Sequence, residues 1–138
     1  MDSGVTKLKQ TLREARSSAT HSRIAVYGHL AKHGPMSVGA LSQQLLHDVD
    51  RATVYRTIEL YEKLGIVNRI WHGFKHQIEL SEIFTPHHHH ALCEHCGKTI
   101  DVTSPELEAA LAALAKRHNF LTINHSVELA GYCQDCQS

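Results

Sequence analysis

Two Cys-x-x-Cys pairs constrain this chain more than any other feature of its 138 residues. Cys93 and Cys96 form the first pair, and Cys133 and Cys136 form the second after a gap of 36 residues. A spacing of two residues lets both sulfurs of a pair face one ion, so two pairs can complete a tetrahedral site of four thiolates. Such a closed site predicts a structural zinc ion that fixes the second pair to a sheet.

A run of four histidines over residues 87–90 comes just before the first cysteine pair. Side chains in a strand alternate between its two faces, so His87 and His89 would lie on one face and His88 and His90 on the other. Each pair offers half of a separate metal site. Candidates for the remaining ligands are Glu79, Asp101, Glu108 and His125. All of these ligands are nitrogen or oxygen, which suits ferrous iron, manganese and zinc.

The rest of the composition bears on compartment and partners. The longest apolar runs are far too short for a membrane span, and the N-terminus lacks the basic-then-apolar layout of a signal peptide. Cysteine pairs without an export signal predict metal ligands in the reducing cytoplasm. Residues 1–83 carry eleven Lys and Arg against eight Asp and Glu, whereas residues 84–138 carry three against six. This asymmetry favours a basic first half that faces a polyanion and an acidic second half that holds cations.

The first half has the pattern of a helix-turn-helix followed by a β-hairpin, which is a winged helix. Apolar residues at helical spacing, Asp50 as an N-cap and Gly65 as a helix end carry this prediction. The hairpin is predicted from two β-rich runs that flank a glycine. The predicted elements are helices over 5–17, 22–33, 38–46 and 51–64 and strands over 66–71 and 75–80.

The helix over 51–64 has the character of a DNA-reading helix. Val54, Ile58 and Tyr61 form its buried stripe, and four polar side chains lie off that stripe in the first turns: Arg51, Thr53, Tyr55 and Arg56. Arginine can bond guanine with two hydrogen bonds, and threonine and tyrosine can contact the thymine methyl group in the major groove. The alternative is a solvated charged face.

The second half predicts an α/β domain over 84–138, joined to the first domain by a linker at about 81–86. Strands are expected over 87–93 and 98–103, and Ser104 followed by Pro105 starts a helix over 106–119. The alternating residues 120–133 predict a long final strand. The whole chain is therefore expected to be α+β.

Four motifs together resemble the ferric uptake regulator (Fur) family over nearly the whole chain. They are Thr20-x-x-Arg23, the sequence ATVYRTIELYEKLGIV at 52–67, the block HHHHALCEHCGKTIDV, and Gly131-x-Cys-x-x-Cys. The resemblance implies a dimeric, metal-responsive repressor with an N-terminal winged helix-turn-helix domain and a C-terminal α/β dimerisation domain. It also implies binding to a palindromic operator in double-stranded DNA.

The resemblance assigns the candidate ligands to three metal sites. The four cysteines correspond to a structural Zn(II) site. Glu79, His88, His90 and Asp101 correspond to a regulatory site at the hinge between the domains, and His87, His89, Glu108 and His125 to an additional site in the dimerisation domain.

Two positions depart from the family pattern. Pro35 stands where the family often has a regulatory histidine, so His33, His72 or His76 could supply a fifth ligand. Ser18 stands where the family has a lysine that contacts the minor groove. Arg13 or Arg16 would then make that contact, beside Arg23 of the Thr-x-x-Arg motif.

The nature of the regulatory metal is the main open choice. Glu79, where zinc sensors often have a nearby cysteine, favours Fe(II) and control of metal-uptake genes, whereas His89, where iron sensors commonly have aspartate, favours Zn(II). A peroxide sensor would tend to carry aspartate in place of Glu79. Two alternatives from other classes are a zinc hydrolase, which needs an open coordination position, and a zinc-stapled protein-interaction module. We expect a regulator without enzymatic activity.

Overall fold

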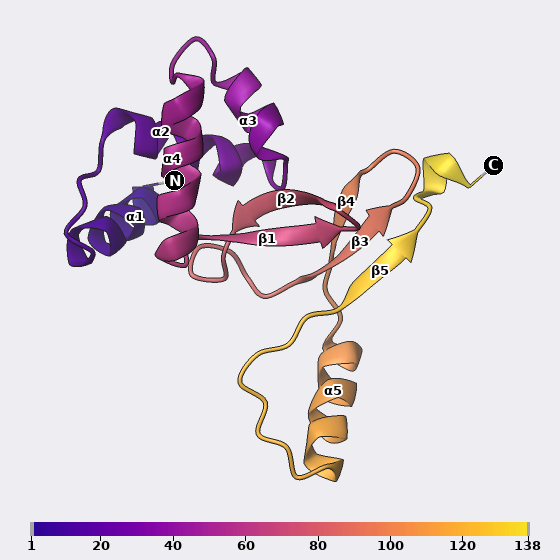
Figure 1. The fold of residues 1–138 in the computed structure, drawn as a ribbon. Helices are drawn as coiled ribbons and strands as arrows, with labels where there is room; N and C mark the ends of the chain where they lie inside the picture. The colour runs from indigo at the N-terminus through magenta and orange to yellow at the C-terminus, as the bar shows by residue number, and fades with distance from the viewer. Residues whose placement is uncertain (1, 138) are drawn as a thin grey trace. The chain divides into compact units, whose positions relative to one another are not determined.

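The computed structural model describes residues 2–137, which divide into two compact units between Pro86 and His87 (Figure 1). The first unit contains α1 (Asp2–Glu14), α2 (His21–His33), α3 (Val38–Gln44), α4 (Arg51–Lys63), β1 (Val67–His72) and β2 (Lys75–Leu80). The second contains β3 (His89–Cys93), β4 (Thr99–Val102), α5 (Pro105–Arg117), β5 (Glu128–Gly131) and a 3-10 turn over Gln134–Cys136. The expected α+β class is confirmed.

Helix ends in the first unit follow their capping residues. Asp50 accepts a hydrogen bond from the backbone N–H of Thr53 at 3.1 Å and starts α4 where the sequence predicts it. Gly65, with φ of +71°, follows the end of α4, a conformation that costs glycine little. Thr20 caps α2 and accepts from the N–H of Arg23 at 3.3 Å.

The core of the first unit lies between its helices and the base of its hairpin. Leu8 and Leu12 of α1 are fully buried, as are Val54 and Tyr61 of α4. The hydroxyl of Tyr61 donates to the Arg23 carbonyl at 2.5 Å, so this buried polar group is satisfied. Helix α4 packs against α2 and α3 and leaves its opposite face in solvent.

The hairpin is antiparallel and regular. Val67 of β1 lies opposite Leu80 of β2, and the pairing continues to His72 and Lys75 across a two-residue turn in which Gly73 has φ of +63°. An isolated bridge between Met36 and Ile78 joins the loop before α3 to β2. The order of helices and hairpin is the one expected for a winged helix-turn-helix.

Residues 81–85, which the sequence places in a linker, pack onto the first unit. The ring of Phe84 lies 5.2 Å from that of Tyr27 in an edge-on arrangement. Lys7 of α1 donates from Nζ to the Ile83 carbonyl at 2.8 Å. This segment is therefore part of the folded unit and not a loose connection.

The second unit is built on a three-stranded sheet in the order β4-β3-β5. Strand β3 pairs antiparallel with β4 and parallel with β5, from His90 opposite Glu128 to Cys93 opposite Gly131. The prediction of one long strand over 120–133 is wrong, because only residues 128–131 find a partner in β3. Sequence alternation alone does not supply that partner.

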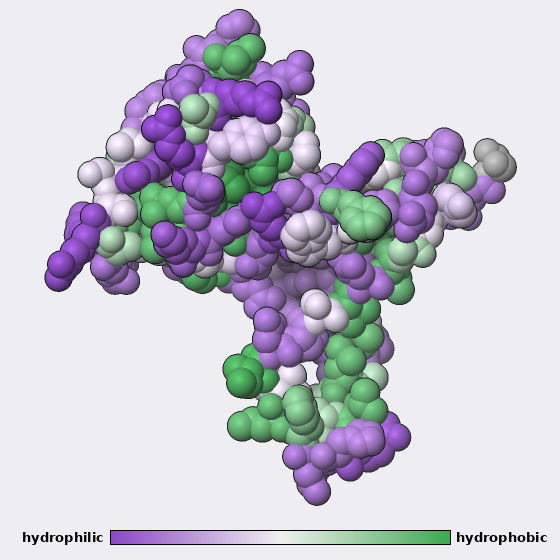
Figure 2. All heavy atoms as spheres, in the orientation of Figure 1, coloured by the Kyte–Doolittle hydropathy of each residue, from purple (hydrophilic) through white to green (hydrophobic). Residues whose placement is uncertain are grey.

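Helix α5 starts at Pro105, with Ser104 accepting from the Leu107 N–H at 3.1 Å. Although all of its residues are described, none is buried. Figure 2 shows apolar side chains gathered at the surface over α5 and beside it. Phe120, Leu121 and Ile123 in the segment that follows are also mostly exposed. The second unit therefore leaves an extended apolar face uncovered within one chain.

Candidate metal centres and nucleic-acid interface

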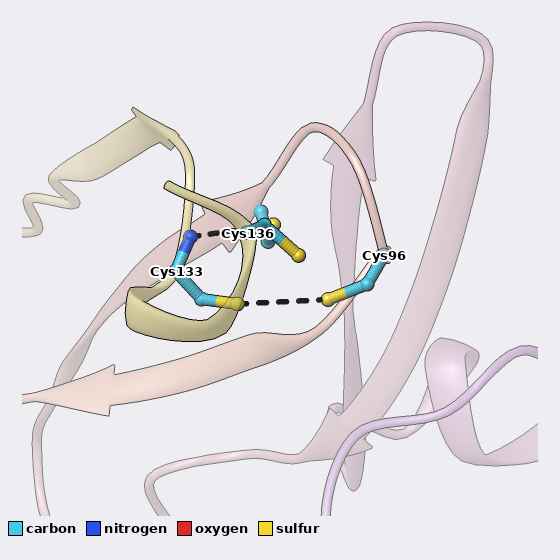
Figure 3. A group of neighbouring side chains, drawn as sticks. Cys96, Cys133 and Cys136 are labelled. Atoms are coloured by element: carbon cyan, nitrogen blue, oxygen red, sulfur yellow. Dashed lines mark hydrogen bonds between the residues drawn. The ribbon is translucent and has the colours of Figure 1, made fainter. Parts of the chain in front are cut away.

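The four cysteines converge at one end of the small sheet. Their sulfur atoms all lie within 4.8 Å of one another, and the Cys96 and Cys133 sulfurs are 3.8 Å apart. Figure 3 shows these two sulfurs facing each other with Cys136 beside them. Four thiolates at about 2.3 Å from a zinc ion would lie about 3.8 Å apart in a tetrahedron. The donor set and its spacing fit structural zinc.

Local electrostatics also prepare this cluster for a cation. The N–H of Cys133 donates to the Cys93 sulfur at 3.3 Å, and this bond, with backbone N–H groups of Cys96 and His95, lowers the pKa of Cys93 to about 6. The neighbouring Cys133 sulfur raises the pKa of Cys136 to about 12. The four thiols therefore do not all ionise together without a nearby positive charge. A zinc ion would supply that charge.

A second group joins one face of β3 to α5. His87, His89 and His125 direct their Nε2 atoms at Glu108 of α5. The His89 and His125 nitrogens each lie 2.6 Å from a Glu108 oxygen, and those of His87 and His125 are 3.1 Å apart. Ligands of one ion at about 2.1 Å would be spaced about 3 Å or more apart, so the two 2.6 Å contacts are hydrogen bonds that a bound ion would replace. Three imidazoles and a carboxylate suit a borderline divalent metal.

Hydrogen bonds in this second group keep Glu108 ionised and orient the His89 ring. The His89 ring, followed by that of His125, lowers the pKa of Glu108, so the carboxylate is ionised at neutral pH. His89 is buried, and its Nδ1 accepts from the Val127 N–H at 3.1 Å. Val127 was missed in the sequence, since a backbone donor leaves no signal in residue type.

A third group lies on the opposite face of β3. The ligand atoms of His88, His90 and Asp101 lie within 4.8 Å of one another, and the two imidazole rings are 4.8 Å apart. Asp101 is directly opposite His90 on β4, which places its carboxylate beside the imidazole pair. Within the second unit this group offers three ligands, one fewer than a closed site has.

The other candidate ligands for this group belong to the first unit. Glu79 is buried on β2, opposite Asn68. His33 ends α2 and His72 ends β1, and His76 contacts Arg69 and stacks 5.0 Å from the Trp71 ring. Among the described residues, no group of three or more potential ligands contains His33, His72 or His76. The participation of Glu79 stays a prediction.

The first turns of α4 present the expected side chains to solvent. Arg51, Tyr55 and Arg56 are exposed, and the Arg51 guanidinium lies 5.2 Å from the centre of the Tyr55 ring. Thr53 differs, because its hydroxyl donates to Asp50 at 2.5 Å. Its hydroxyl therefore serves the helix cap, and only its methyl group remains for a base contact.

The other three candidate DNA-binding arginines differ in their contacts within the protein. The Arg23 guanidinium donates to the Ser18 carbonyl at 2.6 Å, which orders the turn before α2. Arg13 and Arg16 are exposed at the end of α1 and just after it, and Arg16 has φ of +57°. Arg13 and Arg16 are therefore the ones available for a contact with a phosphate backbone.

Known proteins of similar sequence and fold are regulators. Residues 14–130 match the Ferric uptake regulator family. The ferric uptake regulation protein of Campylobacter jejuni is 39% identical over 92 residues, and the aligned part covers 66% of this chain and 57% of that protein. The Campylobacter upsaliensis protein of the same name is 33% identical over 137 residues, covering 94% of this chain and 86% of the relative.

A solved structure extends the likeness to the fold. The Vibrio cholerae ferric uptake regulator, described as having DNA-binding domains, superposes with a TM-score of 0.77 at 30% identity and covers 91% of this chain and 98% of that one. No helix in the described part of the chain is long and apolar enough to cross a membrane. With a family match that spans most of the sequence, the chain is a member of the ferric uptake regulator family.

Proposed function

We propose that this chain is a metal-dependent transcriptional repressor that acts in the cytoplasm as a homodimer and controls metal-uptake genes. The observation that carries the proposal is the histidine run at 87–90 that leads into β3, whose two faces direct separate imidazole pairs at separate carboxylates. One face has four ligands within its own unit, whereas the other has three. The proposed role is regulatory and involves no catalysis.

Helix α4 supports a DNA partner. Arg51, Tyr55 and Arg56 occupy one exposed face at its N-terminal end, where a recognition helix contacts base edges. Arg13 and Arg16 would add contacts with phosphates outside the groove. Double-stranded DNA with a palindromic operator is the target we propose, since a homodimer presents two such helices.

The uncovered apolar surface of the second unit supports a homodimer. A groove of about 760 Å³ runs between α5 and residues 118–125 and is lined mainly by apolar side chains such as Leu111, Leu114 and Phe120. On the sheet, Ile100, Ala91 and Leu129 are adjacent across three strands. Exposed apolar areas of this kind mark interaction sites, and a second copy offers the same surfaces in return.

The regulatory step would use the three-ligand group. His88, His90 and Asp101 would hold a divalent metal together with Glu79 of the first unit. With a metal held by these residues, the two units would be tied together, which would set the spacing of the two α4 helices in a dimer. The gain in the free energy of DNA binding would equal the difference between the metal-binding free energies of two dimer conformations, the one that can bind DNA and the one that cannot.

Fe(II) is the metal we propose for this group, and Zn(II) for the four cysteines. Imidazole and carboxylate ligands without a thiolate suit ferrous iron. A zinc-sensing repressor is the second candidate, and a specific observation favours it. His89 joins His87 and His125 to give three imidazoles around Glu108, a set that zinc holds well.

The decisive experiment measures binding of the full chain to a library of palindromic duplexes at fixed salt. Protein that retains its four-cysteine zinc is titrated anaerobically with Fe(II), Mn(II) or Zn(II), and Asp101→Asn serves as the variant. We expect one metal to raise DNA affinity at least tenfold in the wild type and much less in Asp101→Asn. Binding that ignores every metal would refute the proposal.

A further inference from the structure

Ser81 is a polar residue that is almost fully buried, with 6% of its surface exposed, at the point where the hairpin ends. Its hydroxyl donates to the Gly65 carbonyl at 2.7 Å, and its N–H donates to the Ile66 carbonyl at 2.9 Å. Its own carbonyl accepts from the N–H groups of Phe84 and Thr85 at 2.9 and 3.2 Å, and from the Thr85 hydroxyl at 3.1 Å. One residue thus forms five hydrogen bonds.

The partners on one side of Ser81 are the end of the DNA-reading helix. Leu64 caps α4, Gly65 reverses the chain, and the Ile66 N–H donates back to the Tyr61 carbonyl at 2.8 Å. The Gly65 and Ile66 carbonyls, which lie just beyond this turn, are the acceptors for Ser81. Ser81 is therefore joined directly to the chain reversal that closes α4.

The partners on the other side belong to the segment that leads to the histidines. Phe84 packs on Tyr27, and Ile83 accepts from Lys7, so residues 81–85 are held along their length. The unit ends at Pro86, and His87 begins the next. A five-residue loose linker would absorb a displacement at the histidines, whereas a hydrogen-bonded segment transmits it.

We propose that Ser81 is a positioning residue that couples the start of the metal-binding unit to α4, so that metal occupancy at the histidines changes the placement of the DNA-reading helix. This inference rests on the proposed function, since it concerns how the metal signal reaches α4. Ser81 itself contacts neither metal nor DNA in this scheme.

The test compares Ser81→Ala with Ser42→Ala in the full dimeric protein. Ser42 is a matched control because it is also a buried serine of the first unit, with 4% exposure, but lies on α3. DNA affinity is measured with and without Mn(II), an air-stable probe, and amide hydrogen exchange is followed at Phe84 and Thr85. Should Ser81→Ala fail to fold, Lys7→Met loosens the same segment from an exposed position.

We expect Ser81→Ala to lower the ratio of metal-loaded to metal-free affinity about tenfold and to speed exchange at Phe84 and Thr85. Ser42→Ala should leave that ratio unchanged even where it lowers thermal stability. An unchanged ratio in Ser81→Ala despite faster exchange overturns the inference, as does an equal loss in Ser42→Ala. A wild type without any metal response refutes the proposed function itself, which separates the two failures.

Discussion

Removal of the structural zinc should unfold the second unit and leave the first intact. Among the described residues of the second unit, only His89, Leu92 and Cys93 are buried. Burial of a leucine side chain contributes about 2 kcal/mol, whereas a structural zinc ion contributes about 10 kcal/mol or more. The zinc ion is therefore the main stabilising element of this unit within one chain, and its loss exceeds what so small a core can offset.

Cys133→Ser tests this reasoning, because serine keeps the size of the side chain but supplies no thiolate. We expect the variant to lose its zinc and the exchange protection of β3 and β5, while α2 and α4 keep theirs. Zinc content, far-UV circular dichroism and site-resolved hydrogen exchange check this outcome. His95→Ala is the control, since His95 is exposed beside the cysteines and, among the described residues, belongs to no group of candidate ligands.

The result that would refute the reasoning is a Cys133→Ser protein, free of zinc, in which β3 and β5 stay protected at concentrations where the chain is monomeric. Protection that returns only at high protein concentration would instead show that a second copy replaces the missing core. A sedimentation experiment run beside the exchange measurement distinguishes these two outcomes.

Three further predictions concern the first unit. Asp50→Ala should lower the melting temperature by a few degrees and Asp50→Asn by less, since asparagine keeps the cap. Hydrogen bonds from the Thr53 hydroxyl and then the Thr53 N–H lower the pKa of Asp50 in the folded protein. The stability that Asp50 contributes is therefore present above its pKa in the unfolded chain and is lost as pH falls through the lower folded pKa, which acid titration of both variants checks. Gly4→Ala should destabilise by about 1–3 kcal/mol despite a helix-propensity gain of about 1 kcal/mol, because the new Cβ would meet the Tyr27 hydroxyl at 2.1 Å. In a Tyr27→Phe background the nearest atom is the ring carbon at 3.2 Å, so most of the penalty should disappear in urea unfolding, and an undiminished penalty would contradict the contact. Arg56→Ala should weaken DNA binding and either relax base preference or reduce the salt slope by about 1; Lys63→Ala, at the far end of α4, should do neither.

Local signals in the sequence predicted much of the fold. Asp50 and Ser104 start their helices and Gly65 follows the end of α4, as expected, because caps depend on neighbouring residues alone. The prediction of a strand over 120–133 was wrong, and the packing of the linker segment 81–85 onto the first unit was not predicted, for the same physical reason. Strand length depends on a partner strand, and the order of residues 81–85 depends on distant Lys7 and Tyr27.

The candidate sites divide in a similar way. Strand alternation predicts that His87 lies with His89 and His88 with His90, and the rings are paired in this way. Which carboxylate joins each pair depends on the placement of α5 and β4, which periodicity does not supply. Ser81 left no signal at all, because a serine after a strand reads as a connection until its partners are known.

The strand order of the second unit has a consequence for folding kinetics. Strand β3 is the central strand of the sheet. Its first residue, His89, accepts a hydrogen bond from the N–H of Val127, which immediately precedes β5 and lies 38 residues later in the sequence. Closing a loop of that length costs on the order of 3 kcal/mol of chain entropy before any pairing compensates for it. All four cysteines lie in the second unit, so refolding should show one phase that is independent of zinc and another whose rate rises with zinc concentration.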